Sequence, residues 1–336
     1  MSWLSDDALS RLRSAASAPD LSGTRYLLLE ELGRGGMCTV FLAEDPSLGR
    51  RVALKVLDVP DPGGDLALRL TREARILARL EHPGIAPVHD VGQLPDGRVF
   101  YAMKFVAGPR LDAFAASAAT LPERLRAFSR IVEAVAFAHD RGVLHRDLKP
   151  ENIMVGPFGE VLVMDWGLAK AFAASTGSGA RLPSGAEGSP PAVDGQHTGH
   201  GAVLGTPGYM APEQERGEVD ALDARSDVYA LGAVLYFLLA VKTPPGGGPP
   251  PPAAGVPRPL LAVCAKAMAV EKHDRYSDAV ALDAEIARYL DGRRVEAYPE
   301  SVPQLAARLY ARHKVAFWLI VAYLAVRGTL LFFTGR

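Results

Sequence analysis

Apolar and polar positions alternate along the N-terminal part of the chain, and the pattern becomes helical further on. Over residues 26–57 the alternation has a period of two and breaks at turns rich in glycine or charge, which predicts an antiparallel sheet. Over residues 65–80 apolar residues recur at helical spacing, so one helix is expected to pack on that sheet. After residue 106 the long apolar stretches are helical, first over residues 121–139 and then in DVYALGAVLYFLLA and PLLAVCAKAMA. The pattern predicts an α+β fold with two lobes: a small antiparallel-sheet N-lobe with one helix, and a larger helical C-lobe.

Two segments do not follow this pattern. Residues 171–204 are rich in Ala, Ser, Gly and Pro and have too few large apolar residues to pack, so they are expected to form a long loop. Residues 243–259, TPPGGGPPPPAAGVPRP, are expected to be polyproline-like or irregular. A plain connector is favoured there, and a Pro-rich ligand for a partner protein is the alternative.

An apolar stretch near the C-terminus, residues 315–333, predicts a transmembrane helix. At about 1.5 Å per residue it would reach about 28 Å, enough for the hydrocarbon core of a bilayer. Arg327 interrupts it near one end, where a long side chain can snorkel to the interface. Basic residues within 308–314 precede it and favour a cytoplasmic main domain on a single-pass membrane protein. A buried C-terminal helix is the alternative.

Composition narrows the class of protein. The 336 residues carry a formal net charge of -1, so no overall attraction to nucleic acid follows and none is expected as a partner. The two cysteines, Cys38 and Cys264, have no metal-ligand spacing and fit a reducing cytoplasm. Residues 1–24 contain no continuous apolar core and are interpreted as a leader rather than a secretory signal.

The stretch LGRGGMCTVFLAED contains glycines at Gly33, Gly35 and Gly36, in a loop suited to lie against phosphates. Cys38 stands where a G-x-G-x-x-G pattern would have its last glycine. Backbone N–H groups near Gly35 and Gly36 would meet the phosphates, and a small side chain at position 38 can point away from them. Cys38 is therefore expected to adjust the loop and not to abolish its function. Inert packing is favoured for the thiol over a reactive position above the nucleotide.

The strand in RRVALKVLDV places Ala53 and Lys55 on one face. A flat base needs an unobstructed roof and a phosphate needs a cation, so this face suits a nucleotide. Taken alone, Lys55 would more often be a solvated lysine. Glu73 lies near the inward side of its helix and calls for a cationic partner. Lys55 is the candidate, and pairing with neighbouring arginines on the surface is the alternative.

Two further stretches, VLHRDLKPENIMV and VLVMDWGLAK, bring together the groups that phosphoryl transfer requires. The reaction needs a positioned hydroxyl, neutralisation of charge, and magnesium. Asp147 could orient the hydroxyl, Lys149 could lie near the transferred phosphate, and Asn152 with Asp165 could hold the metal.

With these motifs the chain resembles the protein kinase family, specifically bacterial serine/threonine kinases, over residues 26–290. The resemblance rests on motifs in order: the glycine loop, VALK, Glu73, HRDLKPEN, DWG, GTPGYMAPE, SDVYALG and Arg275. It implies the bilobal kinase fold, with ATP and Mg2+ as cofactors and proteins as substrates. GTPGYMAPE argues for protein substrates, because small-molecule kinases of related shape generally lack it.

The resemblance assigns roles residue by residue. Asp147 is the catalytic aspartate, Lys149 the phosphate-side lysine, and Lys55 holds the α and β phosphates while paired with Glu73. The expected magnesium ligands are Asn152 and Asp165. Met103 is expected as the gatekeeper and residues 104–106 as the hinge. The expected nucleotide-binding positions are Leu32, Gly33, Gly35, Gly36, Val40, Ala53, Lys55, Met103, Lys104, Val106 and Met154.

Other implied roles concern the frame of the site. Asp227 is expected to anchor the catalytic loop, and Glu213 is expected to form a buried ion pair with Arg275 at the end of the activation segment. Arg146 suggests regulation by a phosphate on that segment. The threonines singled out there are Thr176 and Thr198 as phosphorylation candidates and Thr206 as the substrate-side threonine. Trp166 is expected to fill the slot of the usual phenylalanine. The short 243–259 connector lacks a helix that family members often use for docking substrates.

The sequence therefore predicts a membrane-tethered serine/threonine protein kinase that transfers the γ-phosphate of ATP to protein hydroxyls, autophosphorylates and signals. The alternatives are a nucleotide-binding pseudokinase or scaffold and an interaction platform, and a homodimer is left open. The expected parts are a leader (1–24), the N-lobe (25–106), the C-lobe (107–290) with an activation-loop insertion (171–204) and the connector (243–259), a juxtamembrane segment (291–314) and the transmembrane helix (315–333).

Overall fold

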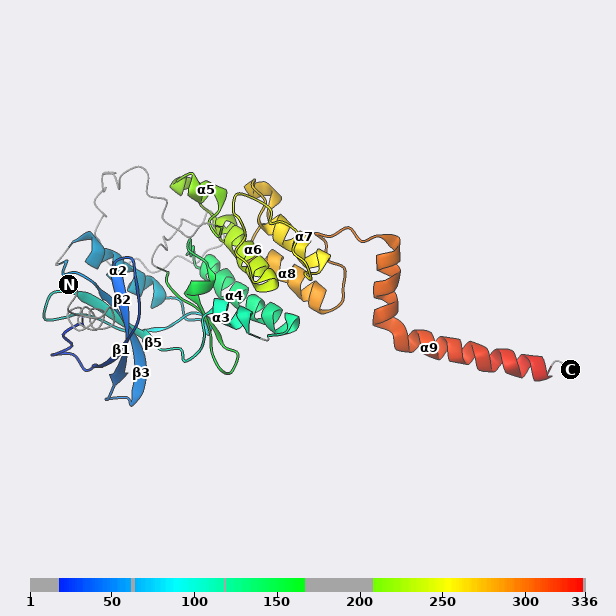
Figure 1. The fold of residues 1–336 in the computed structure, drawn as a ribbon, viewed down its shortest axis with the longest axis horizontal. Coiled ribbons are helices and arrows are strands. Elements are labelled where there is room, and N and C mark those ends of the chain that lie inside the picture. The colour runs from blue at the N-terminus through cyan, green and yellow to red at the C-terminus, as the bar shows by residue number, and fades with distance from the viewer. Residues whose placement is uncertain (1–17, 62–63, 118, 167–207, 335–336) are drawn as a thin grey trace, which may run out of the picture.

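The computed structural model describes residues 18–61, 64–117, 119–166 and 208–334. Most of the predicted leader and the whole of the predicted 171–204 insertion lie outside the described residues, as do Thr176, Thr198 and Thr206. The described residues form a sheet-containing N-lobe and a helical C-lobe (Figure 1).

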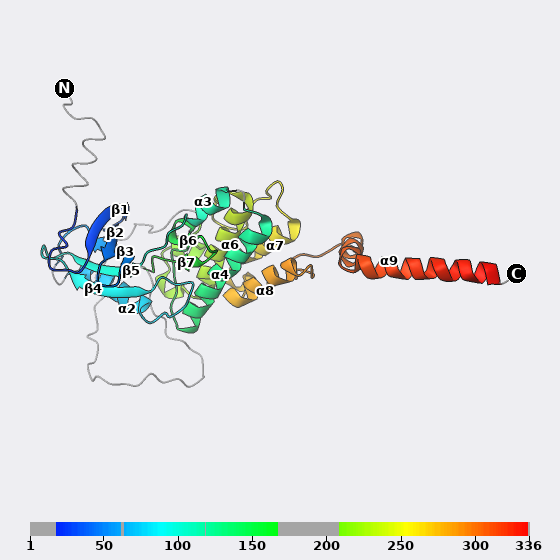
Figure 2. The same cartoon turned by 90° about the horizontal axis from the view of Figure 1, so that it is seen from below.

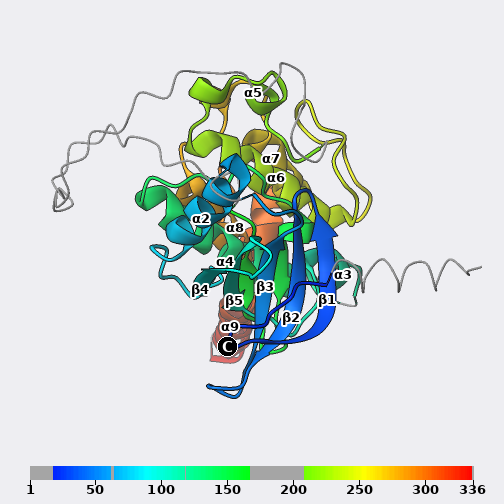
Figure 3. The same cartoon turned by 90° about the vertical axis from the view of Figure 1, so that its left-hand side faces the viewer.

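The N-lobe is built on one antiparallel sheet with strand order β1-β2-β3-β5-β4. Helix α2 (Asp65–Leu77) lies beside it and packs against β5 (Figure 3). The strands are β1 (Leu27–Gly35), β2 (Cys38–Asp45), β3 (Arg50–Leu57), β4 (Val88–Gln93) and β5 (Val99–Lys104). The predicted sheet with one helix is confirmed. The helix ends at Leu77 and not at residue 80, because the chain turns there and Leu80 N donates to Leu77 O.

The two faces of β3 pack in different places, as the alternation predicted. Val52, Leu54 and Val56 belong to one buried cluster, on the face of the sheet away from α2. Ala53 belongs to the main apolar cluster, which includes the inner face of α2. Strand β1 differs from the prediction, because its residues are exposed along nearly the whole strand.

The C-lobe is helical and is arranged around α6 (Ala224–Ala240), most of which is buried. The helices α4, α7 and α8 pack against α6 (Figures 1 and 2). The elements of this lobe are α3 (Leu111–Ala116), α4 (Leu121–Asp140), the hairpin of β6 (Ile153–Val155) and β7 (Val161–Val163), α5 (Pro212–Glu215), α6, α7 (Arg258–Ala267) and α8 (Ala279–Leu290), with 3-10 turns η1 (Pro150–Asn152), η2 (Val219–Ala221) and η3 (Lys272–Asp274).

Local sequence explains where α4 begins. Thr120 precedes the helix, and its backbone N–H donates to Glu123 Oε2 over 2.7 Å in a capping box. Pro122 occupies the first turn, where a missing N–H is harmless.

The chain between α6 and α7 contains no helix among these described residues, as the proline-rich sequence predicted. Val241 ends α6 in a left-handed conformation, with φ of 51°. Further on, Gly248 N donates to Tyr229 Oη of α6 over 3.2 Å, which fixes the connector to the core.

Helix α9 (Val302–Thr334) projects from the C-lobe, and its backbone is non-helical at His313 (Figures 1 and 2). By length and hydropathy, His313–Leu330 could cross a membrane, and none of this 18-residue window is buried in the protein. The window overlaps the predicted span 315–333, and its exposure contradicts the alternative of a buried C-terminal helix.

Candidate active site

Lys55 joins the two parts of the site. From β3 its Nζ atom lies 2.9 Å from Glu73 Oε1 on α2 and 2.8 Å from Asp165 Oδ1, which follows β7. Burial disfavours charge on Lys55, but Tyr101, Asp165 and Glu73 around it outweigh this and raise its pKa well above the ordinary value. Glu73 is buried, so the alternative of a surface pair with neighbouring arginines is wrong.

Asp165 occupies an uncommon backbone conformation, with φ of 56°. Such positions persist where the surroundings fix them, and they cluster at functional sites. Burial raises the pKa of Asp165, but the neighbouring Lys55 ammonium outweighs it and holds the pKa below its ordinary value. The carboxylate is therefore ionised at neutral pH, as a magnesium ligand must be.

The catalytic-loop residues lie together in the C-lobe. Lys149 Nζ is 2.9 Å from Asp147 Oδ2. Asn152 Nδ2 donates to the Asp147 backbone oxygen over 2.9 Å and to Asp147 Oδ2 over 3.1 Å. Both bonds use the amide nitrogen of Asn152, and within the described residues no hydrogen bond reaches its Oδ1 atom. That oxygen has the chemistry that magnesium prefers.

Helix α6 holds this loop through Asp227. Its Oδ2 atom accepts from His145 N over 2.8 Å, and its Oδ1 atom accepts from Arg146 N over 2.9 Å. The same carboxylate lies 2.8 Å from His139 Nε2. Arg146 itself has φ of 69°, a conformation that these bonds help to fix. The predicted anchor is present.

The glycine-rich stretch forms the turn between β1 and β2. Gly36 has φ of 58°, which favours glycine, and a Cβ atom at Gly35 or Gly36 would meet nothing within 4 Å. The turn is therefore open on its outer side. Cys38 lies at the start of β2 and is buried. Burial raises the pKa of the Cys38 thiol to about 11, so the thiol is protonated at neutral pH, as the interpretation of inert packing requires.

The remaining predicted nucleotide positions follow the sheet and the hinge. Gly33, Val40 and Lys55 form one row across β1, β2 and β3, and Ala53 pairs with Met103 of β5. Both Ala53 and Met103 are buried, whereas Leu32 is exposed.

The hinge leads from Lys104 into the C-lobe. A Cβ atom at Gly108 would lie 2.1 Å from the Val155 backbone oxygen, so only glycine allows the chain to pass this close. Val106 is buried, and Met154 of β6 packs partly buried in the same small cluster. The structure thus brings the predicted hinge and Met154 together.

The donor set fits magnesium held with a nucleotide. Within the described residues there is no group of three or more His, Cys, Asp and Glu side chains that could hold a metal. Mg2+ usually takes one or two protein carboxylates and completes its shell with phosphate oxygens and water. Asp165 and Asn152, with the cations Lys55 and Lys149 nearby, match that requirement.

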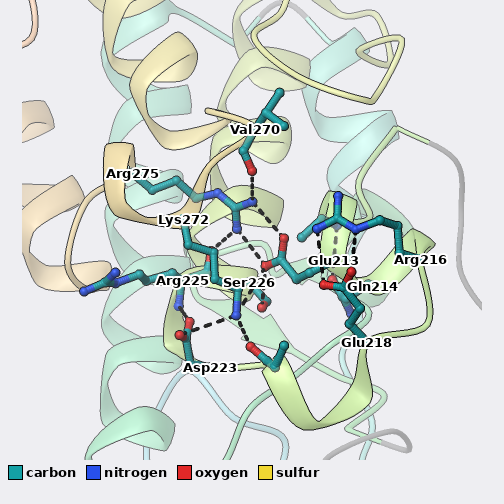
Figure 4. Close-up of polar contacts among 12 residues, drawn as sticks. Glu213, Gln214, Arg216, Glu218, Asp223, Arg225, Ser226, Val270, Lys272 and Arg275 are labelled. Atoms are coloured by element: carbon teal, nitrogen blue, oxygen red, sulfur yellow. Dashed lines mark hydrogen bonds and ion pairs between the residues drawn. The ribbon is translucent and has the colours of Figure 1, made fainter.

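A second polar cluster lies in the C-lobe, around Glu213 of α5 and Arg275 (Figure 4). Arg275 and Glu213 are both buried and meet in two parallel bonds of 2.8 Å. Ser226 Oγ donates to Glu213 Oε1 over 2.7 Å. Burial raises the pKa of Glu213, but the hydrogen bonds from Arg275 and Ser226 outweigh it and lower the pKa to about 2. The predicted ion pair is confirmed.

Trp166 follows Asp165 and is fully buried. Its Nε1 atom donates to the Val163 oxygen over 3.2 Å, and its ring centroid lies 4.6 Å from that of His145. The side chain fills an interior position, as expected.

Two residues with clear contacts to the site were missed. Gln214 Nε2 donates to the Arg146 backbone oxygen over 2.9 Å, which joins the cluster around Glu213 to the catalytic loop. Tyr101 Oη donates to Glu73 Oε1 over 2.8 Å. The sequence did contain a signal for Tyr101. It stands two residues before Met103 on the same strand, so its side chain is expected on the same face of the sheet as the predicted gatekeeper. No comparable signal indicated Gln214.

A lysine held by a helix carboxylate, facing a loop with Asp, Lys and Asn, defines a class of two-lobed phosphotransferases. The profile of the protein kinase domain matches residues 26–249. The chain belongs to the protein kinase family, as its resemblance to bacterial kinases indicated.

The relatives are bacterial. The chain is 34% identical over 308 residues to "Serine/threonine-protein kinase PknD" of Protochlamydia amoebophila, covering 80% of this chain and 30% of that protein. It is 37% identical over 305 residues to "Serine/threonine-protein kinase PknB" of Mycobacterium tuberculosis, covering 84% of this chain and 45% of that protein. The chain thus spans less than half the length of these relatives.

A solved structure confirms the fold. The PknI kinase domain of M. tuberculosis superposes with a TM-score of 0.57 at 27% sequence identity, covering 80% of this chain and 96% of that one. The predicted architecture, a sheet-rich N-lobe and a helical C-lobe, is that of this kinase domain.

Proposed function

We propose that the protein is a serine/threonine protein kinase that transfers the γ-phosphate of ATP to protein hydroxyls with Mg2+. One observation carries the proposal: Lys55 bridges Glu73 on the N-lobe helix and Asp165 beside the C-lobe hairpin. The charged groups of the two lobes therefore meet at one place. The names of the bacterial relatives support the class of substrate.

Each residue of the site has a separate task. Asp147 accepts a hydrogen bond from the substrate hydroxyl and orients it, and Lys149 offers its positive charge to the transferred phosphate. Asn152 and Asp165 would hold Mg2+, and Lys55 would hold the α and β phosphates of ATP. Bound Mg-ATP supplies the phosphoryl group and the neutralising metal charge. Because phosphoryl transfer needs little covalent help, this positioning accounts for the main part of the catalysis.

The remaining nucleotide contacts come from the sheet and hinge. We propose that Val40, Ala53 and Met154 enclose the base, that Leu32, Gly33, Gly35 and Gly36 cover the phosphates, and that Met103, Lys104 and Val106 line the hinge side.

The first test separates a kinase from a pseudokinase scaffold. The full chain, purified in detergent, is incubated with Mg-ATP and a generic basic protein, and phosphosites are mapped. We expect phosphoserine or phosphothreonine on the added protein or on the chain itself, and none when EDTA removes the magnesium. ATP that raises the melting temperature, with no transfer under any condition, would instead support the scaffold.

We propose further that α9 anchors the protein in a membrane, with the kinase domain in the cytoplasm. Aromatic side chains gather where the apolar window begins: Trp318 Nε1 donates to Tyr310 Oη over 3.1 Å, and Phe317 contacts both rings. Tyr and Trp favour membrane–water interfaces. Arg308 and Lys314 lie on the side expected to face the cytoplasm.

Deletion of residues 315–336 tests the anchor. We expect the full chain to sediment with membranes and to resist extraction by high salt and carbonate, and the shortened chain to remain in the supernatant. Equal partitioning of the two chains would contradict the anchor, and catalytic activity is expected to be the same for both.

A further inference from the structure

We infer that Tyr101 is a positioning residue that holds Glu73, and with it α2, in the arrangement that pairs Glu73 with Lys55. The inference rests on the proposed kinase function, because it concerns the same site. It adds a third side chain to the pair of Lys55 and Glu73.

The sheet brings Tyr101 to this place. In the register between β3 and β5, Tyr101 lies directly opposite Lys55. Side chains opposite each other on neighbouring strands emerge on the same face, about 4.5 to 5.5 Å apart. That face carries α2, so both side chains point toward Glu73. Tyr101 is only 1% exposed.

The contacts converge on one oxygen atom. Tyr101 Oη donates to Glu73 Oε1 over 2.8 Å, and Lys55 Nζ lies 2.9 Å from the same atom. The Lys55 ammonium lies 5.8 Å from the centroid of the Tyr101 ring. Burial is the largest influence on Tyr101 and raises its pKa well above the ordinary value. The hydroxyl is therefore protonated at neutral pH and can donate a hydrogen bond.

A buried carboxylate requires donors, and among the described residues Glu73 has two, Lys55 and Tyr101. Lys55 is not committed to Glu73, because it also bonds to Asp165 over 2.8 Å. Two carboxylates thus share one ammonium. The hydroxyl of Tyr101 stabilises the inward position of Glu73 whether Lys55 bonds to Glu73 or to Asp165. Without it, Glu73 would depend on Lys55 alone, and α2 would leave the sheet more often.

The test compares Tyr101→Phe with a matched control, Tyr276→Phe, in the full chain. The Tyr276 hydroxyl is buried with no hydrogen-bond partner among the described residues, so its removal deletes a hydroxyl but no hydrogen bond. Two quantities are measured: kcat and KM for ATP in steady-state transfer, and hydrogen exchange of the α2 amides. For Tyr101→Phe we expect kcat/KM to fall about tenfold, because the free energy of a hydrogen bond to a charged group corresponds to about a tenfold change in rate. We also expect the α2 amides to exchange hydrogen faster, because α2 would leave the sheet more often. Tyr276→Phe is expected to change neither.

A double-mutant cycle separates positioning from general stability. In a Glu73→Ala background, Tyr101→Phe is expected to lower kcat/KM less than about twofold further, because alanine offers no oxygen atom for the Tyr101 hydroxyl to bond to. A tenfold loss in both backgrounds would assign Tyr101 a merely structural role and overturn the inference. So would unchanged kcat/KM and unchanged α2 exchange in the single variant. If the unmutated chain transfers no phosphate, the proposed function fails, and α2 exchange alone still decides the role of Tyr101.

Discussion

The Asp165→Ala variant is expected to lose phosphoryl transfer by about a thousandfold or more while remaining folded. A metal ion supplies several kcal/mol of charge stabilisation in the transition state, and about 4 kcal/mol corresponds to three orders of magnitude in rate. Asp165 is the carboxylate that faces both Lys55 and the catalytic-loop side of the site. The fold should tolerate its loss, because the side chain is 45% exposed and Lys55 keeps its bond to Glu73.

The measurement is the rate of phosphate transfer from Mg-ATP, together with a melting curve for each protein. Asp140→Ala is the matched control: its carboxylate is 82% exposed, and among the described residues its one ion-pair partner is Arg141 at the end of α4. We expect that control to transfer phosphate at the unmutated rate. Undiminished activity in Asp165→Ala would refute the assigned metal role. A folded Asp165→Ala protein that still binds ATP would show that the loss concerns the metal and not the pocket.

The sequence predicted those parts of the site that depend on strand alternation and on motif order. Alternation placed Ala53 and Lys55 on one face of the strand, and in the structure that face meets α2. The ordered motifs placed Asp147, Asn152 and Asp165 in two segments close together in the sequence. Both kinds of prediction use information along the chain, because the side-chain period of a strand is fixed by its geometry. They agree with the contacts that the structure shows.

The contacts that were missed join segments distant in sequence. Tyr101 meets Glu73 across 28 positions, and Gln214 meets Arg146 across 68. Alternation gives the face of a strand on which a hydroxyl lies, but which oxygen that hydroxyl or an amide reaches depends on the pairing of segments far apart in the chain, and a local pattern does not give that pairing. The exposure of β1 was missed for a related reason, since alternation cannot show whether another layer covers the strand.

The second large effect concerns stability. Arg275→Leu is expected to lower the melting temperature by about 6 to 20 °C at pH 7, because breaking a buried ion pair costs about 3 to 5 kcal/mol. Glu213 would remain buried with Ser226 as a donor and Lys272 Nζ at 4.0 Å (Figure 4). The matched control is Arg216→Ala, whose pair with Glu218 is about half exposed. Because solvent screens exposed ion pairs, we expect this control to leave the melting temperature nearly unchanged.

The pH dependence of this effect has a definite sign. The pKa of Glu213 is lowered from 4.5 to about 2 in the folded protein, so the folded state gains stability from it above pH 4.5. That gain is lost as the pH falls from 4.5 toward 2, where the carboxylate becomes protonated. We therefore expect the difference in melting temperature between the unmutated chain and Arg275→Leu to narrow between pH 7 and pH 3. A difference that stays constant over this range would contradict the lowered pKa.

A double variant keeps the test decisive if Arg275→Leu does not fold. In Glu213→Gln with Arg275→Leu, neither side chain carries a charge, so no unpaired charge is buried and a smaller loss of melting temperature is expected than in Arg275→Leu alone.

The ion pair also lies close to the catalytic loop. Glu213 is next in sequence to Gln214, whose side chain donates to the Arg146 backbone oxygen of that loop. If the ion pair also holds that loop, Arg275→Leu should lower kcat at a temperature where the variant is still folded, and the double variant should recover part of it.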